Sequence, residues 1–287
     1  MKSPRGWITW VRYKTVAVTG SQGFLGLEIV KTLRQEGYEV LGLSHSKIDY
    51  HDVGTLSRAL KGVEILIHAG WAGIARDDRD NVELQQLNVD ISRNLIEACK
   101  IARVMHFVGL GSQAEFGNQV APFEDDQVIS PTSQYGFAKY SVYKYLKEAE
   151  IQFTWARVFS AYGEGDTRDW IFTKAVNAIR NQETLTVGSC SQLWSLTHKS
   201  DIASGVKWII EKSILEAVNL ASTEARTLKS YLEELQNLAG QLDVIRYSQD
   251  LIPQNDIYPS KGKMHTSGWT PQIPFDEGVL GCLGKLN

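Results

Sequence analysis

The 287-residue sequence has few cysteines, no long apolar run and no strong excess of charge of one sign. Its three cysteines (Cys99, Cys190 and Cys282) lie far apart and lack any metal-binding spacing, which indicates reduced thiols rather than disulfides or a zinc site. No apolar run approaches the ~18–20 residues of a membrane span, and no secretory signal is visible. A net charge of −3 gives no electrostatic reason to expect nucleic acid or an anionic membrane as partner. We therefore expect a cytoplasmic protein that binds neither.

The most informative stretch is the glycine-rich segment 19–26, Thr-Gly-Ser-Gln-Gly-Phe-Leu-Gly. It follows a short β-branched run, typical of a buried parallel strand, and precedes apolar residues at helical spacing. Glycines at such a junction allow a tight turn and close approach of a pyrophosphate, and the helix N-terminus presents free N–H groups to it. The segment predicts a dinucleotide site, with a plain glycine-rich turn as the alternative. The predicted cofactor contacts in it are Gly20, Gln22, Gly23, Phe24 and Leu25.

The end of the next expected strand, 38–43, bears on the choice of cofactor. An acidic residue there would hydrogen-bond the adenosine ribose and repel a 2′-phosphate. The sequence instead has Ser44, His45 and Lys47. We therefore favour NADP(H), while NAD(H) and a merely solvated polar loop stay open. Asp49 is a candidate partner of the adenine amino group, or else a capping or surface aspartate.

Strands and helices alternate through the first 110 residues. We expect strands ending near Gly70 and Ser112, a helix capped by Asp52 and another helix beginning at Asn88. This alternation predicts an α/β fold with a doubly wound parallel sheet of the Rossmann type. Ligands bind such sheets beyond the carboxyl ends of the strands. We therefore expect the cofactor to lie against Ala69 and Gly70.

A tyrosine and a lysine at helical spacing are the candidate proton-transfer groups. Tyr135 and Lys139, at i and i+4, share one face of a helix. An ammonium beside a phenol stabilises the phenolate and lowers the tyrosine pKa from ~10 toward working pH. Ser112 at a strand end can hydrogen-bond the same substrate oxygen, which suits proton transfer during hydride exchange with nicotinamide. The spacing recurs at Tyr140–Lys144 and Tyr143–Lys147, but Tyr135 begins the helix, where a side chain can face a cleft.

Five motifs together resemble the extended short-chain dehydrogenase/reductases, in particular the NAD(P)-dependent nucleotide-sugar epimerase/dehydratase family. They are Thr19-Gly-x-x-Gly-x-x-Gly26, Asn88 in the run to Ala98, Gly111-Ser112-Gln-Ala-Glu-Phe116-Gly117, Tyr135-Gly-Phe-Ala-Lys139 and Ala156-Arg157-Val-Phe-Ser-Ala-Tyr162-Gly163. With the segment 200–203 they cover about residues 14–220. The resemblance implies Ser112, Tyr135 and Lys139 as the catalytic trio, and Tyr135 and Lys139 also as cofactor contacts.

Departures from the family pattern narrow the expected chemistry. Dehydratases of the group have an Asp–Glu pair where this sequence has Gln113 and Ala114, so 4,6-dehydration is not expected. The fucose-nucleotide epimerase–reductases use a cysteine near that position, and no cysteine here fits. The 4-epimerases that retain NAD usually carry an acidic residue where Ser44 stands. We therefore expect reduction of the C4 ketone of a nucleotide-linked deoxysugar by NADPH, with 4-epimerisation on retained NAD, or non-catalytic dinucleotide sensing, as the alternatives.

The substrate side of the expected site is less well defined. Trp194 stands where many family members present an arginine to the nucleotide diphosphate, seven residues before Asp201. Other cations would then hold the diphosphate, or the substrate carries no nucleotide. Arg168 and Lys174 are candidates, although either can be a solvated helix charge. The predicted substrate contacts are Ser112, Gln113, Arg168, Lys174 and Trp194.

We expect the chain to fold into two domains. Residues 14–165 should form the Rossmann domain, to which 192–222 returns, while 166–191 and 223–287 should form a smaller substrate-binding lobe. The helices around 94–98 and 140–147 can pair across a two-fold axis, as in many relatives of the family, which implies a homodimer.

Overall fold

A computed structural model describes residues 14–44, 48–73, 77–248 and 255–284. Its centre is a six-stranded sheet in the order β10-β5-β4-β3-β1-β2, and every neighbouring pair in it is parallel. The strands are β1 (Thr15–Thr19), β2 (Glu39–Leu43), β3 (Ile65–His68), β4 (His106–Ser112), β5 (Phe153–Val158) and β10 (Glu216–Leu220). The chain starts in the interior of the sheet, moves outward to β2 and returns to β3. The direction of winding therefore reverses at β1, where open α/β sheets bind their ligands.

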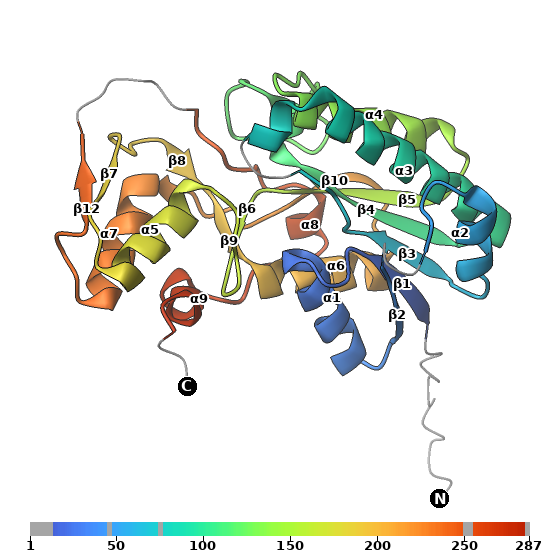
Figure 1. Cartoon of the computed structure of the whole chain (residues 1–287), viewed down its shortest axis with the longest axis horizontal. Helices are drawn as coiled ribbons and strands as arrows, with labels where there is room; N and C mark the ends of the chain where they lie inside the picture. Colours follow the sequence, from blue (N-terminus) through green and yellow to red (C-terminus); the bar gives the residue numbers. More distant parts are fainter. Residues whose placement is uncertain (1–13, 45–47, 74–76, 249–254, 285–287) are drawn as a thin grey trace, which may run out of the picture.

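Helices cover both faces of this sheet (Figure 1). On one face lie α1 (Phe24–Gln35) and α6 (Lys199–Lys212), and on the other lie α2 (Val53–Ala59), α3 (Val82–Ala102) and α4 (Gln134–Glu148). Successive side chains of a strand point to opposite faces of the sheet. Val16 and Val18 therefore pack in the core under α1 and α6, and Ala17 packs in the core under α2, α3 and α4. The predicted doubly wound parallel sheet is confirmed.

The ends of two helices test the sequence-based boundaries. Asp52 caps α2 as predicted, because its carboxylate accepts hydrogen bonds from the N–H groups of Gly54 and Thr55. The prediction that a helix begins at Asn88 is wrong. Helix α3 begins at Val82, after an N-cap by Asn81, and Asn88 lies inside it. The first turns of α3 carry mostly polar residues, so the apolar repeat becomes visible only about two turns after the true start.

A second group of elements packs around its own core, at the left of Figure 1. It contains α5 (Ile171–Asn181), α7 (Leu228–Ala239), α9 (Phe275–Cys282) and two short sheets, in which β7 (Leu185–Val187) pairs with β12 (Ile245–Tyr247) and β8 (Leu193–Trp194) pairs with β11 (Arg226–Thr227). The pair of β6 (Ser160–Tyr162) with β9 (Leu196–His198) leads from β5 into this group and back to α6. The remaining elements are η1 (Asp77–Asp80), η2 (Gln113–Phe116) and α8 (Lys263–Thr266). Among the described helices none is both long and apolar enough to cross a membrane.

Candidate active site

The glycine-rich turn after β1 packs directly against the end of β3. Gly20 has φ of +63°, and a Cβ there would lie 2.6 Å from the Cα of Gly70. A Cβ on Gly26 would lie 2.0 Å from the carbonyl oxygen of Gly20. Side chains at these positions are therefore excluded by backbone, not by flexible neighbours. The turn brings Gly20 together with Ala69 and Gly70, as the sequence predicts for a dinucleotide cradle.

The N-terminus of α1 at this turn suits a phosphate. Its N-cap is Gly23, which supplies no side-chain cap, and the first turn holds no acidic residue. The first N–H groups of the helix and its positive dipole end therefore remain available to an anion. Gln22 and Gly23 are exposed, while Phe24 and Leu25 are half-buried. The residues present fit a dinucleotide pyrophosphate.

The structure describes Ser44 and Asp49 of the residues expected near the adenosine ribose. Ser44 directly follows β2 and is half-buried. His45 and Lys47 lie outside the described residues. Asp49 is exposed, and its carboxylate accepts a hydrogen bond from the backbone N–H of His51 at 2.8 Å. The preference for NADP(H) therefore stays a prediction.

Two buried polar residues hold the end of β3 in place. His68 bridges the hydroxyls of Thr19 at 2.8 Å and Ser92 at 2.9 Å, so it is structural rather than catalytic. Asn88 binds the backbone N–H and the carbonyl of Ala72 through its side-chain amide, both at 2.9 Å. Its matched position in the family motif is thus explained by positioning of the loop after β3.

The predicted trio meets at the carboxyl end of β4. Ser112 ends that strand, and its hydroxyl lies close enough to Tyr135 to favour the ionised form of the phenol, which lowers the tyrosine pKa. The same hydroxyl accepts from the N–H of Ala114 at 3.2 Å and donates to the Gln113 side-chain oxygen at 3.1 Å. Tyr135 lies in the first turn of α4 and, like Lys139, is buried.

The ammonium of Lys139 is directed away from the phenol. It donates to the carbonyl of Leu110 at 2.8 Å and lies 3.6 Å from the centroid of the Trp71 ring, but 5.7 Å from that of Tyr135. Trp71, which our sequence reasoning missed, also lies edge-on to Tyr135 with ring centroids 6.0 Å apart. Tyr135 and Lys139 therefore share a face of α4, as predicted, without a direct contact between their polar ends.

The expectation that Lys139 lowers the pKa of Tyr135 is wrong for this structure. Burial raises the pKa of Tyr135 above its ordinary value, and the groups that most oppose this rise are Arg79 and the Ser112 hydroxyl. Burial also lowers the pKa of Lys139 to about 7, against the influence of the Glu115 carboxylate. Both side chains lose water on folding, and the cost of desolvating each charge outweighs the attraction of the opposite charges around it.

The other two tyrosine–lysine pairs of α4 have a different setting. Lys144 and Lys147 are exposed, and their ammonium groups lie 5.0 Å and 5.9 Å from the ring centroids of Tyr140 and Tyr143. Both tyrosines are only half-buried. This contrast supports the choice of Tyr135, whose catalytic role stays a prediction.

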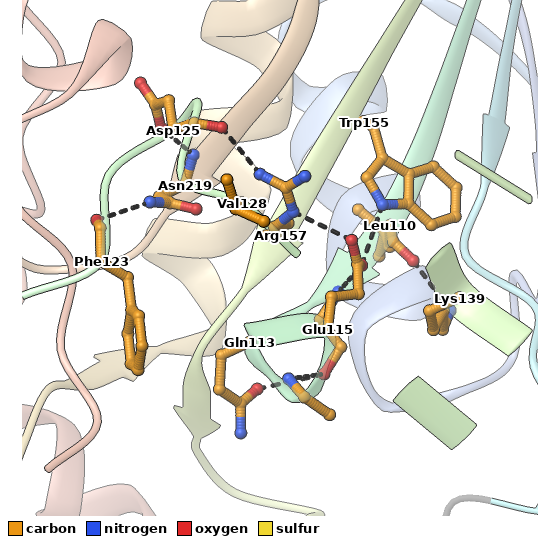
Figure 2. A network of polar contacts seen from close by, with 12 residues as sticks. Leu110, Gln113, Glu115, Phe123, Asp125, Val128, Lys139, Trp155, Arg157 and Asn219 are labelled. Atoms are coloured by element: carbon orange, nitrogen blue, oxygen red, sulfur yellow. Dashed lines mark hydrogen bonds and ion pairs between the residues drawn. The ribbon is translucent and has the colours of Figure 1, made fainter. Parts of the chain in front are cut away.

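A buried carboxylate next to the trio was missed by our sequence reasoning (Figure 2). Glu115, which is fully buried, accepts hydrogen bonds from the N–H of Ser112 at 2.8 Å, Trp155 Nε1 at 2.9 Å and Arg157 Nε at 2.9 Å. Arg157 donates further to the carbonyl of Asp125 at 2.9 Å. The signal was present, because Ser-x-x-Glu is the pattern of a capping box, and Ser112 and Glu115 form one.

Not all of the predicted substrate contacts lie near Ser112, Tyr135 and Lys139. Arg168 pairs with Asp166 at 2.7 Å, and its guanidinium carbon lies 4.8 Å above the ring of Phe24, beside the glycine turn. Lys174 lies on α5 and forms an ion pair with Asp169 at 3.0 Å, with both side chains about half exposed.

Trp194 occupies an aromatic layer of the second group. Its ring stacks on Trp170 with centroids 6.2 Å apart, and its Nε1 is buried without a partner within the described part of the chain. The contacts of Lys174 and Trp194 with a substrate stay predictions, whereas Gln113 and Arg168 do lie near the trio.

A cavity of about 570 Å³ lies elsewhere in the described structure. Its lining comes from β9, α6, the end of β10 and the segment after it, α7 and the chain from residue 260 onward, and includes Asp201, Asn219 and Arg226. None of the trio or of the glycine-turn residues lines it. It is therefore separate from the candidate active site.

Comparison with known proteins identifies relatives of this arrangement. The pattern of the NAD dependent epimerase/dehydratase family matches residues 16–221. An uncharacterised UDP-glucose epimerase of Bacillus subtilis is 24% identical over 246 residues, which cover 81% of this chain and 77% of that protein. The dTDP-6-deoxy-L-talose 4-dehydrogenase (NAD(+)) of Aggregatibacter actinomycetemcomitans is 21% identical over 281 residues, which cover 88% of this chain and 98% of that protein. The solved GDP-mannoheptose C4 reductase of Campylobacter jejuni, with NADP bound, is similar with a TM-score of 0.81 at 13% identity, covering 95% of this chain and 98% of that one.

Proposed function

This chain belongs to the NAD dependent epimerase/dehydratase family of extended short-chain dehydrogenase/reductases, and we propose that it reduces the C4 ketone of a nucleotide-linked deoxysugar with NADPH. The observation that carries this proposal is the convergence of Ser112 and Tyr135 at the carboxyl end of β4. The absence of an acid–base pair after Ser112 supports a reaction that needs one proton donor and no second catalytic carboxylate.

Each residue of the trio has a stated role in this proposal. The nicotinamide, when bound, supplies the hydride. Tyr135 gives its hydroxyl proton to the carbonyl oxygen that becomes the product hydroxyl. Ser112 donates a hydrogen bond to the same oxygen and so fixes its distance from Tyr135. The family resemblance gives Lys139 a contact with the nicotinamide ribose.

The cofactor preference rests on the strand end after β2. Ser44 replaces the acidic residue that would repel a 2′-phosphate. Relatives use both cofactors, since the Campylobacter reductase binds NADP and the Aggregatibacter dehydrogenase is named for NAD(+). Calorimetric titration of the purified protein with NADPH and with NADH tests the preference. Tighter binding of NADPH supports the proposal, and tighter binding of NADH contradicts it.

A 4-epimerase is the second candidate, because the Bacillus relative is named a UDP-glucose epimerase. The same trio would then act twice around a transient ketone, with NAD retained. Denaturing the purified protein and measuring released nicotinamide separates the two. Stoichiometric NAD favours epimerisation. Protein that releases none, and that oxidises NADPH when given a nucleotide-linked 4-keto-6-deoxysugar, supports reduction.

We also propose that two copies of the chain pair through α3 and α4. These helices pack on each other, and their outer faces carry exposed apolar residues, among them Leu87 with 39% exposure and Phe137 with 48%. Sedimentation velocity of the wild type and of Phe137→Glu tests this. A dimer that the substitution dissociates supports the proposal, and a wild-type monomer rejects it.

A further inference from the structure

A short helical turn between β3 and α3 places a cation over the ring of Tyr135. This is η1, and the guanidinium carbon of its Arg79 lies 5.2 Å from the centroid of that ring. The ammonium of Lys139 is farther from the same centroid, at 5.7 Å. A cation at this distance over an aromatic face is within the range of a cation–π contact.

The turn that carries Arg79 is anchored on both sides. The carboxylate of Asp80 accepts a hydrogen bond from the N–H of Gln134 at 3.2 Å, in the residue before Tyr135. The side-chain amide of Gln85 donates to the carbonyl of Asp78 at 3.0 Å, which ties η1 to α3. The position of Arg79 is therefore set by the same elements that position the tyrosine.

Other charged groups lie near Tyr135, and Arg79 itself is flanked on η1 by Asp77, Asp78 and Asp80. Arg168 approaches from the segment after β6, but its charge is shared with Asp166. Glu115 approaches from η2 and opposes ionisation of the phenol, although Arg157 neutralises it. Lys139, from α4 itself, donates to the Leu110 carbonyl rather than to the phenol.

We propose that Arg79 is a positioning residue of the reaction, whose guanidinium stabilises the phenolate left on Tyr135 after proton donation. The inference rests on the proposed reduction. In that reaction hydride from NADPH adds to the ketone carbon, and the O–H bond of Tyr135 breaks as its proton moves to the ketone oxygen. The electron pair of that bond remains on the phenol oxygen, so a negative charge appears beneath Arg79.

The size of the effect of Arg79 on the pKa of Tyr135 depends on how exposed the guanidinium is to solvent. Arg79 is exposed to solvent, so its attraction for the phenolate is weakened by water and by salt. At this distance in a largely aqueous dielectric the attraction is worth about half a pKa unit, up to about one. We therefore expect a moderate shift that decreases at high ionic strength.

The chain offers a matched control for this contact. Arg93, on α3, lies with its guanidinium carbon 5.3 Å from the ring centroid of Tyr145, in the same geometry over a tyrosine outside the site. Arg93→Met removes a similar cation without touching Tyr135. Arg79→Lys keeps the charge and loses the planar guanidinium.

The experiment replaces Tyr135 by 3,5-difluorotyrosine and follows its ¹⁹F resonance against pH. The fluorinated phenol is more acidic than tyrosine, so it ionises at pH values at which the protein is still folded. We expect Arg79→Met to raise its pKa by about half a unit or more at low salt, Arg79→Lys to retain most of the wild-type value and Arg93→Met to leave it unchanged. An unchanged pKa in Arg79→Met overturns the proposal, as does an equal shift in Arg93→Met.

A kinetic measurement on the same fluorinated chains gives an independent readout. For NADPH-dependent reduction, the alkaline limb of kcat/KM should move upward in Arg79→Met by the same amount, with KM for NADPH little changed. An alkaline limb that stays in place contradicts the inference. Should the wild type reduce no 4-keto sugar, the ¹⁹F titration still decides on Arg79, while the proposed reaction alone fails.

Discussion

Replacing Glu115 by glutamine removes the charge at the centre of the network that holds Ser112. The side chains of Glu115 and Arg157 are 0% and 2% exposed, and the carboxylate accepts three hydrogen bonds. Glutamine keeps the shape, but its NH₂ group faces a donor and Arg157 loses its counter-ion. Breaking a buried ion pair on one side costs about 3–5 kcal/mol. We expect Glu115→Gln to lower the free energy of unfolding by about this amount.

Urea unfolding followed by tryptophan fluorescence measures this change, and the eight tryptophans of the chain provide the signal. Glu234→Gln is the matched control, because Glu234 and its partner Arg226 form an ion pair whose side chains are 30% and 29% exposed and which should contribute about 0–1 kcal/mol. Adding Arg157→Met to Glu115→Gln removes the orphaned charge and should restore part of the loss. A Glu115→Gln cost below about 1 kcal/mol, equal to that of the control, would refute our view of the network.

Two further substitutions test the lysine and the glycine turn. Folded Lys139 has a pKa of about 7 against an ordinary value of 10.5, so between these pH values the unfolded chain binds a proton that the folded chain does not. The free energy of unfolding of the wild type should therefore rise with pH across this window relative to Lys139→Met, and parallel pH profiles would contradict this. Gly20→Ala should cost roughly 2–4 kcal/mol and abolish NADPH binding, because its Cβ meets Gly70. Gly240→Ala, also at positive φ but with open space around it, should cost only about 1 kcal/mol and leave binding intact.

The fold was largely predictable because its signals are local. The β-branched runs before the glycine turn and before Gly70 are strands, and Asp52 caps its helix, since each depends on neighbours in the sequence. The start of α3 was missed because its cap and polar first turns carry no apolar repeat. Local patterns thus located the elements better than their ends.

The proximity of Ser112 and Tyr135 was predictable from the sequence, but the electrostatics around them was not. The spacing of Tyr135 and Lys139 and the strand end at Ser112 could be recognised from sequence. The burial of Tyr135 could not be recognised from the sequence, and this burial reverses the expected shift in the tyrosine pKa. Arg79 and Glu115 act from segments 56 and 20 residues before Tyr135, which only the folded chain brings together.

Tyr135→Phe tests the central claim most directly, because it removes one hydroxyl from a buried ring and keeps the ring itself in place. The rate of NADPH oxidation at 340 nm is measured for wild type and variant with a nucleotide-linked 4-keto-6-deoxysugar, alongside the Kd for NADPH. Loss of the proton donor predicts a decrease in kcat of about 10²–10⁴-fold with an unchanged Kd. A variant that turns over the substrate at the wild-type rate would contradict the account.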